Sequence, residues 1–320
     1  MPNVEIAIQN GSTIYYPDIE GGVTWETERK GVPGKLSFSV IKDQDASFQE
    51  GNAVFMKVDS KQVFYGFVFQ KKRDKEHHIK VTAYDQLRYF KNKDTYVYSN
   101  KRADELLKMI AADFRLQVGT IENTGFKIER RREENKTLFD IVQTALDYTL
   151  QNKKKMYVLY DDFGKLTLKN IESMKLDLLI DEETGENFDY TSSIDGETYN
   201  KIKLAYNNEK TGKREIYIAQ DSKHMNQWGI LQYFETIDEK VNGKAKADTL
   251  LALYNKKTRN LSIKKAFGDI RVRGGSSPAV QLNLGDLITR NYMVVEKAKH
   301  TFDEGEHWMD LTMRGGEFIA

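Results

Sequence analysis

The stretch VTAYDQLRYFKNKDTYVY, Val81–Tyr98, decides how the chain is interpreted. Its first residues alternate in the manner of a strand, and TYVY at its end returns to a strand pattern. Between the two, Asp85 is placed to cap a short helical turn in which Leu87 and Phe90 are spaced to face inward. A short helix between strands can cap the open end of a β-barrel. We therefore interpret the stretch as a structural plug between strands.

The chain before this stretch has the pattern of strands almost throughout. Short strand-like runs follow one another from Val4, and apolar and polar residues alternate in KLSFSV, Lys35–Val40. Gly66 in VFYGFVF indicates the bend or bulge that a closing barrel needs. Regularly spaced short strands with turns are typical of a barrel or a sandwich. Residues 1–98 are therefore predicted to form an N-terminal β-barrel-like domain.

The hydrophobic period changes after residue 98. NKRADELLKMIAADF and TLFDIVQTALDYTLQ each place apolar residues on one face of a helix. A hairpin pattern, Met156–Asn170, and an acidic irregular segment follow, and strand patterns return from about residue 196 with one helix in NGKAKADTLLALYN. The predicted fold is mainly β with α insertions (α+β). A helical insertion with a β-hairpin and an acidic linker, 99–195, separates the first domain from a second β-barrel-like domain with one helix, 196–320.

The composition excludes several classes of function. The 320 residues include no cysteine, which rules out disulfides, thiol nucleophiles and thiolate metal sites. Lys+Arg 49 and Asp+Glu 48 leave a net charge of +1, so no overall field attracts nucleic acid. The mean hydropathy is −0.63, and no apolar run approaches the roughly 18 residues of a spanning helix. We expect no direct nucleic-acid recognition, no membrane segment, no secretory signal and synthesis in a reducing cytoplasm.

Two short motifs resemble nucleotide sites but lack the context that would give them meaning. DDFG, Asp161–Gly164, has no Gly-rich loop or HRD loop with it, and a β-turn explains it. GGSS, Gly274–Ser277, lacks the Gly-Lys-Ser/Thr ending of a phosphate loop, and a loop between strands explains it. No Gly-x-Ser-x-Gly elbow is present. We therefore predict a non-enzymatic protein with no catalytic, cofactor-binding or metal-binding residues and no cofactor.

The histidines allow one weak metal hypothesis. His300 and His307 flank TFDEGE, and Asp303 and Glu304 lie between them. No HExxH spacing supports a metal site, so a solvated hairpin is the favoured interpretation. The adjacent pair His77–His78 would point to opposite faces of a strand and is a poor joint ligand for one metal.

Two alternative functions remain open from the residues alone. A cell-wall (peptidoglycan) hydrolase would need a carboxylate pair in a cleft, for which Asp303, Glu304 and Glu306 are candidates. A carbohydrate-binding β module would need an aromatic stacking platform, for which the candidates are Trp25, Trp228 and Trp308.

A collinear series of stretches resembles the XkdQ-like proteins of PBSX-type defective phages and R-type bacteriocins. The stretches are VFYGFVF, VTAYDQLRYFKNKDTYVY, ADELLKMIAADFRL, NKTLFDIVQTALDYT, YVLYDDFGKLTLKN, WGILQ, AKADTLLALYNKKTRNLSI, RGGSS and YMVVEKAKHTFDEGEHWMDLTM. The resemblance covers almost the whole chain, and the ordered set is specific although no single motif is. As a structural signature it singles out Tyr84, Asp85, Gln86, Leu87, Trp228 and Gly229.

The resemblance implies a structural role. XkdQ-like proteins are similar to the baseplate hub proteins of contractile tails and, more distantly, to the hub portion of the VgrG spikes of type VI secretion. This implies a homotrimeric ring, with two β-barrel domains in each subunit, that adapts the six-fold tail tube to the three-fold spike. The implied partners are two further copies, the tail-tube protein, the spike protein and other baseplate components. The implied location is the baseplate of a phage tail or tail-like particle whose parts are made in the bacterial cytoplasm.

Overall fold

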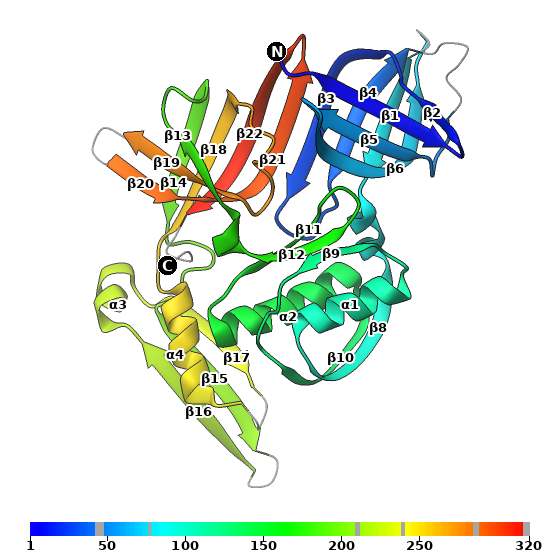
Figure 1. The fold of residues 1–320 in the computed structure, drawn as a ribbon. Coiled ribbons are helices and arrows are strands. Elements are labelled where there is room, and N and C mark those ends of the chain that lie inside the picture. The colour runs from blue at the N-terminus through cyan, green and yellow to red at the C-terminus, as the bar shows by residue number, and fades with distance from the viewer. Residues whose placement is uncertain (42–47, 76–77, 209–211, 238–240, 284–287, 316–320) are drawn as a thin grey trace.

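The computed structural model describes residues 1–41, 48–75, 78–208, 212–237, 241–283 and 288–315. One large sheet occupies the upper half of the molecule, and two smaller bodies lie below it (Figure 1). The sheet has eleven strands in the order β14-β18-β22-β21-β3-β4-β7-β6-β5-β1-β2. The strands are β1 (Val4–Asn10), β2 (Thr13–Tyr15), β3 (Ile19–Glu28), β4 (Lys35–Ile41), β5 (Ala53–Val58), β6 (Lys61–Arg73), β7 (His78–Tyr84), β14 (Asn187–Ser193), β18 (Thr258–Phe267), β21 (Val294–Asp303) and β22 (Glu306–Gly315).

The two ends of the chain meet inside this sheet. β3 pairs antiparallel with β21 in a register that runs from Glu28↔Lys297 to Val23↔Phe302. The alternation seen in KLSFSV is realised in β4, where Leu36 and Val40 are fully buried. Burial of such a side chain contributes about 1.5–3 kcal/mol, so the strict alternation fixes which face of the strand turns inward. Strands from both ends of the sequence therefore form one hydrogen-bonded body.

The mainly β fold with α insertions is confirmed, but the two separate barrel-like domains are not found in that form. The described strands close no barrel, since β14 and β2 stand at the two ends of the sheet order. A strand pattern shows which face is buried, whereas it does not show which strand lies beside it. The domain limits at 98/99 and 195/196 remain a prediction.

The helical insertion packs two helices between two small sheets. α1 (Ala103–Asp113) contacts α2 (Leu138–Lys153), and their apolar faces share a core with Phe90, Tyr98 and Leu168. β8 (Lys93–Lys101) pairs with β10 (Ile128–Thr137), and β12 (Leu166–Asn170) lies between β11 (Tyr157–Asp161) and β9 (Val118–Ile121). Two short 3-10 helices, η1 (Gln86–Lys91) and η2 (Ile171–Met174), connect these strands to their neighbours.

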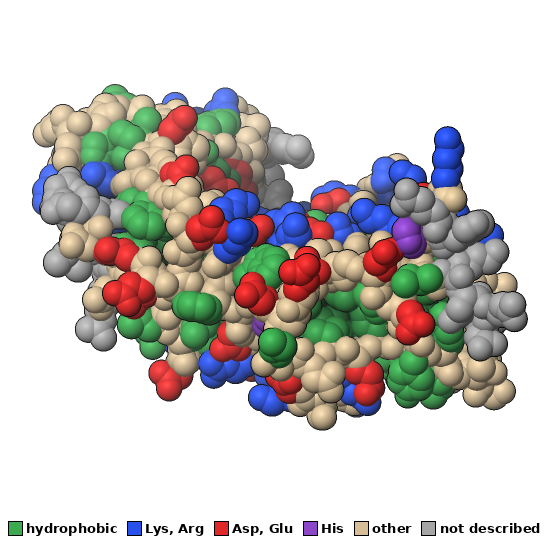
Figure 2. Space-filling model, turned by 90° about the horizontal axis from the view of Figure 1, so that it is seen from above, with side chains coloured by type: hydrophobic (Ala, Val, Ile, Leu, Met, Phe, Trp, Pro, Cys, Tyr) green, Lys and Arg blue, Asp and Glu red, His purple; other side chains and the backbone are tan. Residues whose placement is uncertain are grey.

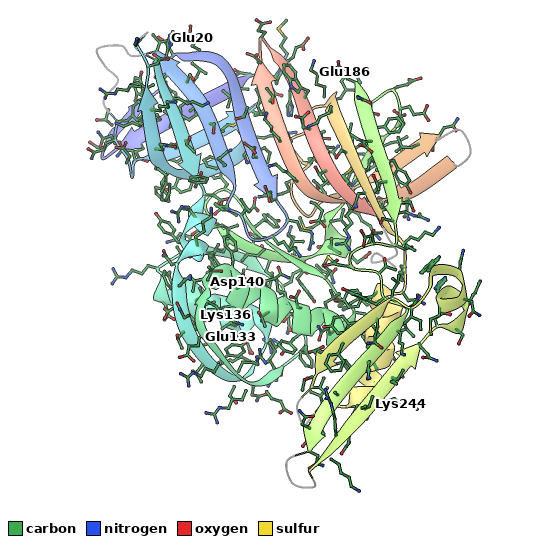
Figure 3. All side chains as sticks on the ribbon, turned by 180° about the vertical axis from the view of Figure 1, so that it is seen from behind. Glu20, Glu133, Lys136, Asp140, Glu186 and Lys244 are labelled. Carbon is green, nitrogen blue, oxygen red and sulfur yellow. The ribbon has the colours of Figure 1, made fainter. Side chains whose placement is uncertain are left out.

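A second small body projects at the lower end of the molecule, visible from behind in Figure 3. Its sheet has the order β16-β15-β17, and α4 packs on that sheet. A third small sheet, β13-β19-β20, lies beside the C-terminal strands of the large sheet (Figure 1). The elements are β13 (Lys175–Ile180), β15 (Lys201–Asn208), β16 (Lys213–Gln220), α3 (Ser222–Trp228), β17 (Gln232–Thr236), α4 (Gly243–Tyr254), β19 (Ser277–Asn283) and β20 (Ile288–Tyr292).

The surface agrees with the near-neutral net charge. Figure 2, which views the molecule from above, shows acidic and basic side chains intermixed over that face. Among the helices of the described chain, none has the length and apolar character needed to cross a membrane.

Candidate functional site

The signature stretch binds the backbone of two distant segments. Asp85 caps η1 by accepting the Leu87 N–H at 3.0 Å, and its second oxygen accepts the Gly34 N–H at 2.8 Å. Gln86 accepts the Gln117 N–H at 3.0 Å and donates to the Gln117 carbonyl at 3.2 Å. A carboxylate offers only acceptors and an amide offers both donor and acceptor, which is why these two residue types suit the two tasks. The predicted plug is therefore an anchor that ties η1 to two other parts of the chain.

The DDFG stretch closes a turn beside this anchor. Asp161 is buried and accepts the Gly164 N–H at 2.6 Å, and Gly164 has a positive φ of 82°. A Cβ at Gly164 would overlap the Tyr65 ring, and the Phe163 ring lies 5.8 Å from that ring. The predicted β-turn is therefore found here, and it presses the hairpin β11–β12 against β6 of the large sheet.

The RGGSS stretch supplies a cation to the same place. Arg273 donates from Nη2 to the Asp161 carbonyl at 2.7 Å, and its guanidinium lies 4.0 Å from the centre of the Tyr160 ring. The two glycine N–H groups are already bound, Gly274 to Thr27 Oγ1 at 2.9 Å and Gly275 to the Val295 carbonyl at 2.7 Å. A phosphate cradle needs free N–H groups, so the predicted loop between strands is the correct interpretation.

Together these residues form a polar junction, which we define as Asp85, Gln86, Asp161 and Arg273. Asp161 Oδ2 and Arg273 Nε are both buried, and neither atom has a hydrogen-bond partner among the described residues. The Arg273 guanidinium therefore acts on the Asp161 carboxylate by Coulombic attraction, without a hydrogen bond between these two atoms. Burial and the charge of Asp161 raise the pKa of Asp85 well above its usual range, and burial also raises the pKa of Asp161. Two carboxyl groups facing one guanidinium in a dry site favour the protonated form of one of them.

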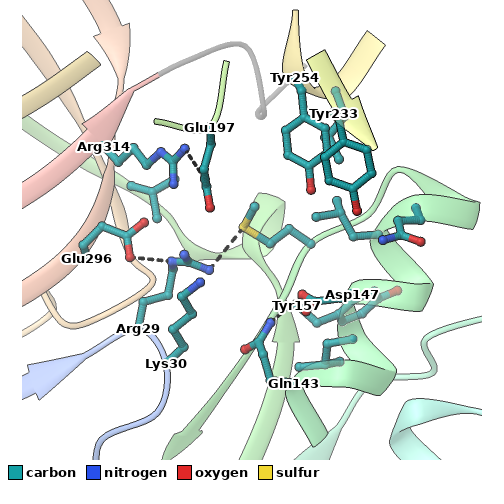
Figure 4. Close-up of a pocket in the computed structure, with 16 residues that line it drawn as sticks. Arg29, Lys30, Gln143, Asp147, Tyr157, Glu197, Tyr233, Tyr254, Glu296 and Arg314 are labelled. Atoms are coloured by element: carbon teal, nitrogen blue, oxygen red, sulfur yellow. Dashed lines mark hydrogen bonds and ion pairs between the residues drawn. The ribbon is translucent and has the colours of Figure 1, made fainter. Parts of the chain in front are cut away.

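A cavity of about 320 Å³ lies where the large sheet, the helical insertion and the projecting body meet (Figure 4). Arg29 at the end of β3 pairs with Glu296 of β21 at 2.9 Å, and Arg314 of β22 pairs with Glu197 at 2.7 Å. Asp147 of α2 accepts a hydrogen bond from Gln143 at 2.7 Å. The cavity wall is completed by other residues, which include Lys30, Met156, Tyr157, Tyr233 and Tyr254.

The titratable groups of this cavity act on one another across the boundary. Arg314 lowers the pKa of Glu197, whereas burial raises the pKa of Asp147. Burial, followed by the charges of Glu197 and Asp147, raises the pKa of Tyr254. Because residues of all three bodies line this space and the charges of Glu197 and Asp147 act on Tyr254 of α4, we regard the cavity as part of the boundary between the three bodies.

The histidine pair is a packed core element. His300 is fully buried, with its ring 4.6 Å from the Trp25 ring, and its Nε2 donates to the Val272 carbonyl at 2.8 Å. That tautomer leaves Nδ1 to accept from His307 Nε2 at 3.0 Å. Burial lowers the pKa of His300 to about 3 and that of His307 to about 4. The favoured solvated hairpin is therefore wrong for the side chain of His300, because β21 turns it into the core of the sheet.

The residues of the alternative functions lie apart or in solvent. Glu304 and Glu306 are exposed at the turn between β21 and β22, without the burial that a general acid needs. Trp25 is 3% exposed and pairs with His300, whereas Trp308 pairs with the next residue of the same strand, Thr301. Because successive residues of a strand point to opposite faces, Trp25 and Trp308 lie on opposite faces of the sheet. Among the described residues, no group of three or more potential His, Asp or Glu ligands gathers at one place. His77 lies outside the described residues.

The second part of the signature lies in the projecting body, away from the junction. Trp228 ends α3 with its ring 4.0 Å from that of His224, and Gly229 follows with a positive φ of 77°. The buried Asn200 donates to the Gly229 carbonyl at 2.7 Å and accepts the Leu231 N–H at 2.9 Å. The remaining signature residue, Tyr84, ends β7 with an edge contact to Phe69 at 5.6 Å.

Sequence reasoning missed Asp161 and Arg273 as members of one site. Each was assigned to a separate loop, although both belong to stretches of the collinear series. Two signals were available in the sequence: Asp161 follows apolar strand residues in YVLYDD, and Arg273 precedes two glycines in VRGGSS. The pairing of the two loops depends on contacts 112 residues apart.

Comparisons with known proteins agree over nearly the full length. The model of the YQBQ-like family matches residues 23–314. Protein YqbQ of Bacillus subtilis (strain 168) is 30% identical over 302 residues and covers 90% of both chains. The phage-like element PBSX protein XkdQ of the same organism is 31% identical over 301 residues, again 90% of both chains. These matches confirm the resemblance found in the sequence.

Solved structures share the fold at low identity. The 43 kDa tail protein of prophage MuSo2 from Shewanella oneidensis has a TM-score of 0.69 at 11% identity, covering 99% of this chain and 100% of that chain. The E. coli c3393 protein, a component of the type VI secretion system, has a TM-score of 0.57 at 8% identity, covering 98% of this chain and 77% of that chain.

Proposed function

The chain belongs to the YQBQ-like family, and on this premise we propose that it is a structural component of a phage tail or phage-tail-like particle, namely its baseplate hub. Three copies form a ring that adapts the six-fold tail tube to the three-fold spike. The two halves of the large sheet act as the two quasi-equivalent β units of each subunit. The role is mechanical and needs no cofactor.

The observation that carries the proposal is the continuous sheet. A hub at the end of a tail has to transmit load between its neighbours without separating into domains. Here β3 and β21 join the two ends of the chain over a register of six residue pairs. The polar junction then fixes the helical insertion to both halves, because the Gly34 N–H donates to the Asp85 carboxylate and Arg273 donates to the Asp161 carbonyl. Hydrogen-bonded strands and short bridging contacts suit a rigid adapter.

The membership in a family with a phage-element member, XkdQ, supports a tail role, and the shared fold with a prophage tail protein is consistent with it. The intermixed surface charge also suits a protein whose contacts are with other proteins.

The test is the assembly state of the purified chain. We expect sedimentation equilibrium to give a trimer mass and negative-stain images to show a three-fold ring, alone or after addition of the tail-tube or spike protein of the same particle. A chain that stays monomeric at high concentration and binds neither neighbour would contradict the hub role. A parallel incubation with peptidoglycan, expected to release no fragments above buffer, separates the hub from a hydrolase.

A further inference from the structure

The sheet of the projecting body has one covered face and one open face. α4 covers the first, on which Leu204 is fully buried and Glu235 pairs with Lys246 of α4 at 2.7 Å. Successive residues of a strand point to opposite faces. The register of the three strands therefore places another set of apolar residues on the second face, namely Ile216, Ile218 and Phe234.

These three side chains are exposed to solvent on the same face of the sheet. Ile216 is 49% exposed, Ile218 is 53% exposed and Phe234 is 49% exposed. Lys203 of β15 pairs with both Ile218 and Phe234, so these residues form one row across the sheet, with Ile216 in the next row beside Ala205. None of the other described elements crosses this face in the view from behind (Figure 3). Exposed apolar side chains that gather with a polar surround mark interaction surfaces.

The charged residues on this face are all basic. Lys201 and Lys203 lie on β15, and Arg214 of β16 reaches over Phe234 with its guanidinium 5.6 Å from the ring centre. No carboxylate of the described residues forms an ion pair with any of the three, in contrast to Lys246 on the covered face. The other positions that the register assigns to this face carry no acid; they are Ala205, Asn207, Gln220, Gln232 and Thr236.

The geometry points to a docking surface, which we call the open face and define as Lys201, Lys203, Arg214, Ile216, Ile218 and Phe234. Its occupant is another protein of the particle whose own surface carries apolar side chains interspersed with carboxylates. Three cations that pair with no carboxylate of the described residues lie among these apolar side chains, so they gain from opposite charges and are repelled by like charges. Contact between the open faces of two copies would set cations against cations, so the chemistry favours a different protein. This inference rests on the proposed tail role.

The test measures binding of the full chain to the purified tail-tube and spike proteins of the same particle. Ile218→Glu places a negative charge among the apolar side chains of the open face, and the double variant Lys203→Glu/Arg214→Glu reverses two of the cations. Two controls match these changes elsewhere: Lys244→Glu on the exposed side of α4, and Val97→Glu at a position on β8 that is 57% exposed. Circular dichroism checks that every variant is folded.

We expect one of the two proteins to bind the wild type, and higher salt to weaken that binding. Both open-face variants should raise Kd about tenfold or more, whereas both controls should stay within about twofold. If the wild type binds and the open-face variants behave like the controls, the open face is not the docking surface, and the hub role stands. If the wild type binds neither protein, the assignment of another protein of the particle to the open face fails, and the hub role fails with it only if the chain is also monomeric in sedimentation. If instead the wild type self-associates in sedimentation and Ile218→Glu abolishes this, the occupant is a second copy, and the assignment of a different protein is overturned.

Discussion

Replacement of Arg273 by methionine tests whether the polar junction holds the three parts of the molecule together. Methionine keeps the length and the apolar stem of the side chain and removes the guanidinium. The change deletes the 2.7 Å hydrogen bond to the Asp161 carbonyl and the stacking on Tyr160 at 4.0 Å. It also leaves Asp85 and Asp161 without the cation that lowers the pKa of each.

The magnitude follows from those lost contacts. A hydrogen bond to a charged group contributes about 1.5–3 kcal/mol, and a partly desolvated cation over an aromatic ring contributes about 1 kcal/mol. We therefore expect Arg273→Met to lower the free energy of unfolding by about 3 kcal/mol. A domain has about 5–15 kcal/mol in total, so the variant should still fold.

The assay is urea unfolding at neutral pH, followed by far-ultraviolet circular dichroism and tryptophan fluorescence. Arg271→Met is the matched control, because Arg271 lies two residues earlier in the same loop, its side chain is 54% exposed, and its pairing with Asp269 lies near the surface. An exposed pair of this kind contributes less than about 1 kcal/mol. If Arg273→Met costs no more than Arg271→Met, the junction does not hold the three parts together, and this reasoning is wrong.

Three further predictions concern groups that the tertiary structure buries. Below pH 6.5 the histidines of the unfolded chain are protonated, whereas folded His300 and His307 stay neutral, so the free energy of unfolding decreases as the pH is lowered. His300→Gln should reduce that dependence by about 1.4 kcal/mol per pH unit between roughly pH 6 and 4, as measured by urea titrations at a series of pH values. The raised pKa of Asp85 has the opposite sign: its contribution to stability is full below about pH 4 and is lost as the pH rises through the folded pKa. Asp161→Asn removes one cause of that rise, so this variant should lose less stability than the wild type as the pH is raised above about 4. An equal or larger loss would contradict the shared site. A Cβ on Gly34 would overlap the Asp85 carboxylate, so Gly34→Ala should cost about 1–3 kcal/mol in the same urea assay, and an unchanged midpoint would show that the anchor is loose.

The sequence by itself determined the local elements and the family. Alternation in KLSFSV and helical spacing in ADELLKMIAAD depend on residues within one or two turns of one another, so the buried faces of β4 and α1 follow directly from the pattern. The capping role of Asp85 is local in the same sense, because Leu87 is two residues away. The collinear series of stretches also sufficed to predict the relationship to XkdQ-like proteins, which the comparisons confirmed.

Only the tertiary structure decided which of these elements meet. The bond from Gly34 to Asp85 spans 51 residues, that from Arg273 to Asp161 spans 112, and that from Gly274 to Thr27 spans 247. A strand pattern shows which side chains are buried, and it carries no information on the neighbouring strand, so the pairing of β3 with β21 could not be predicted from the sequence. For the same reason DDFG and RGGSS, each explained locally as a turn or a loop, became one site only when the sheet brought them together.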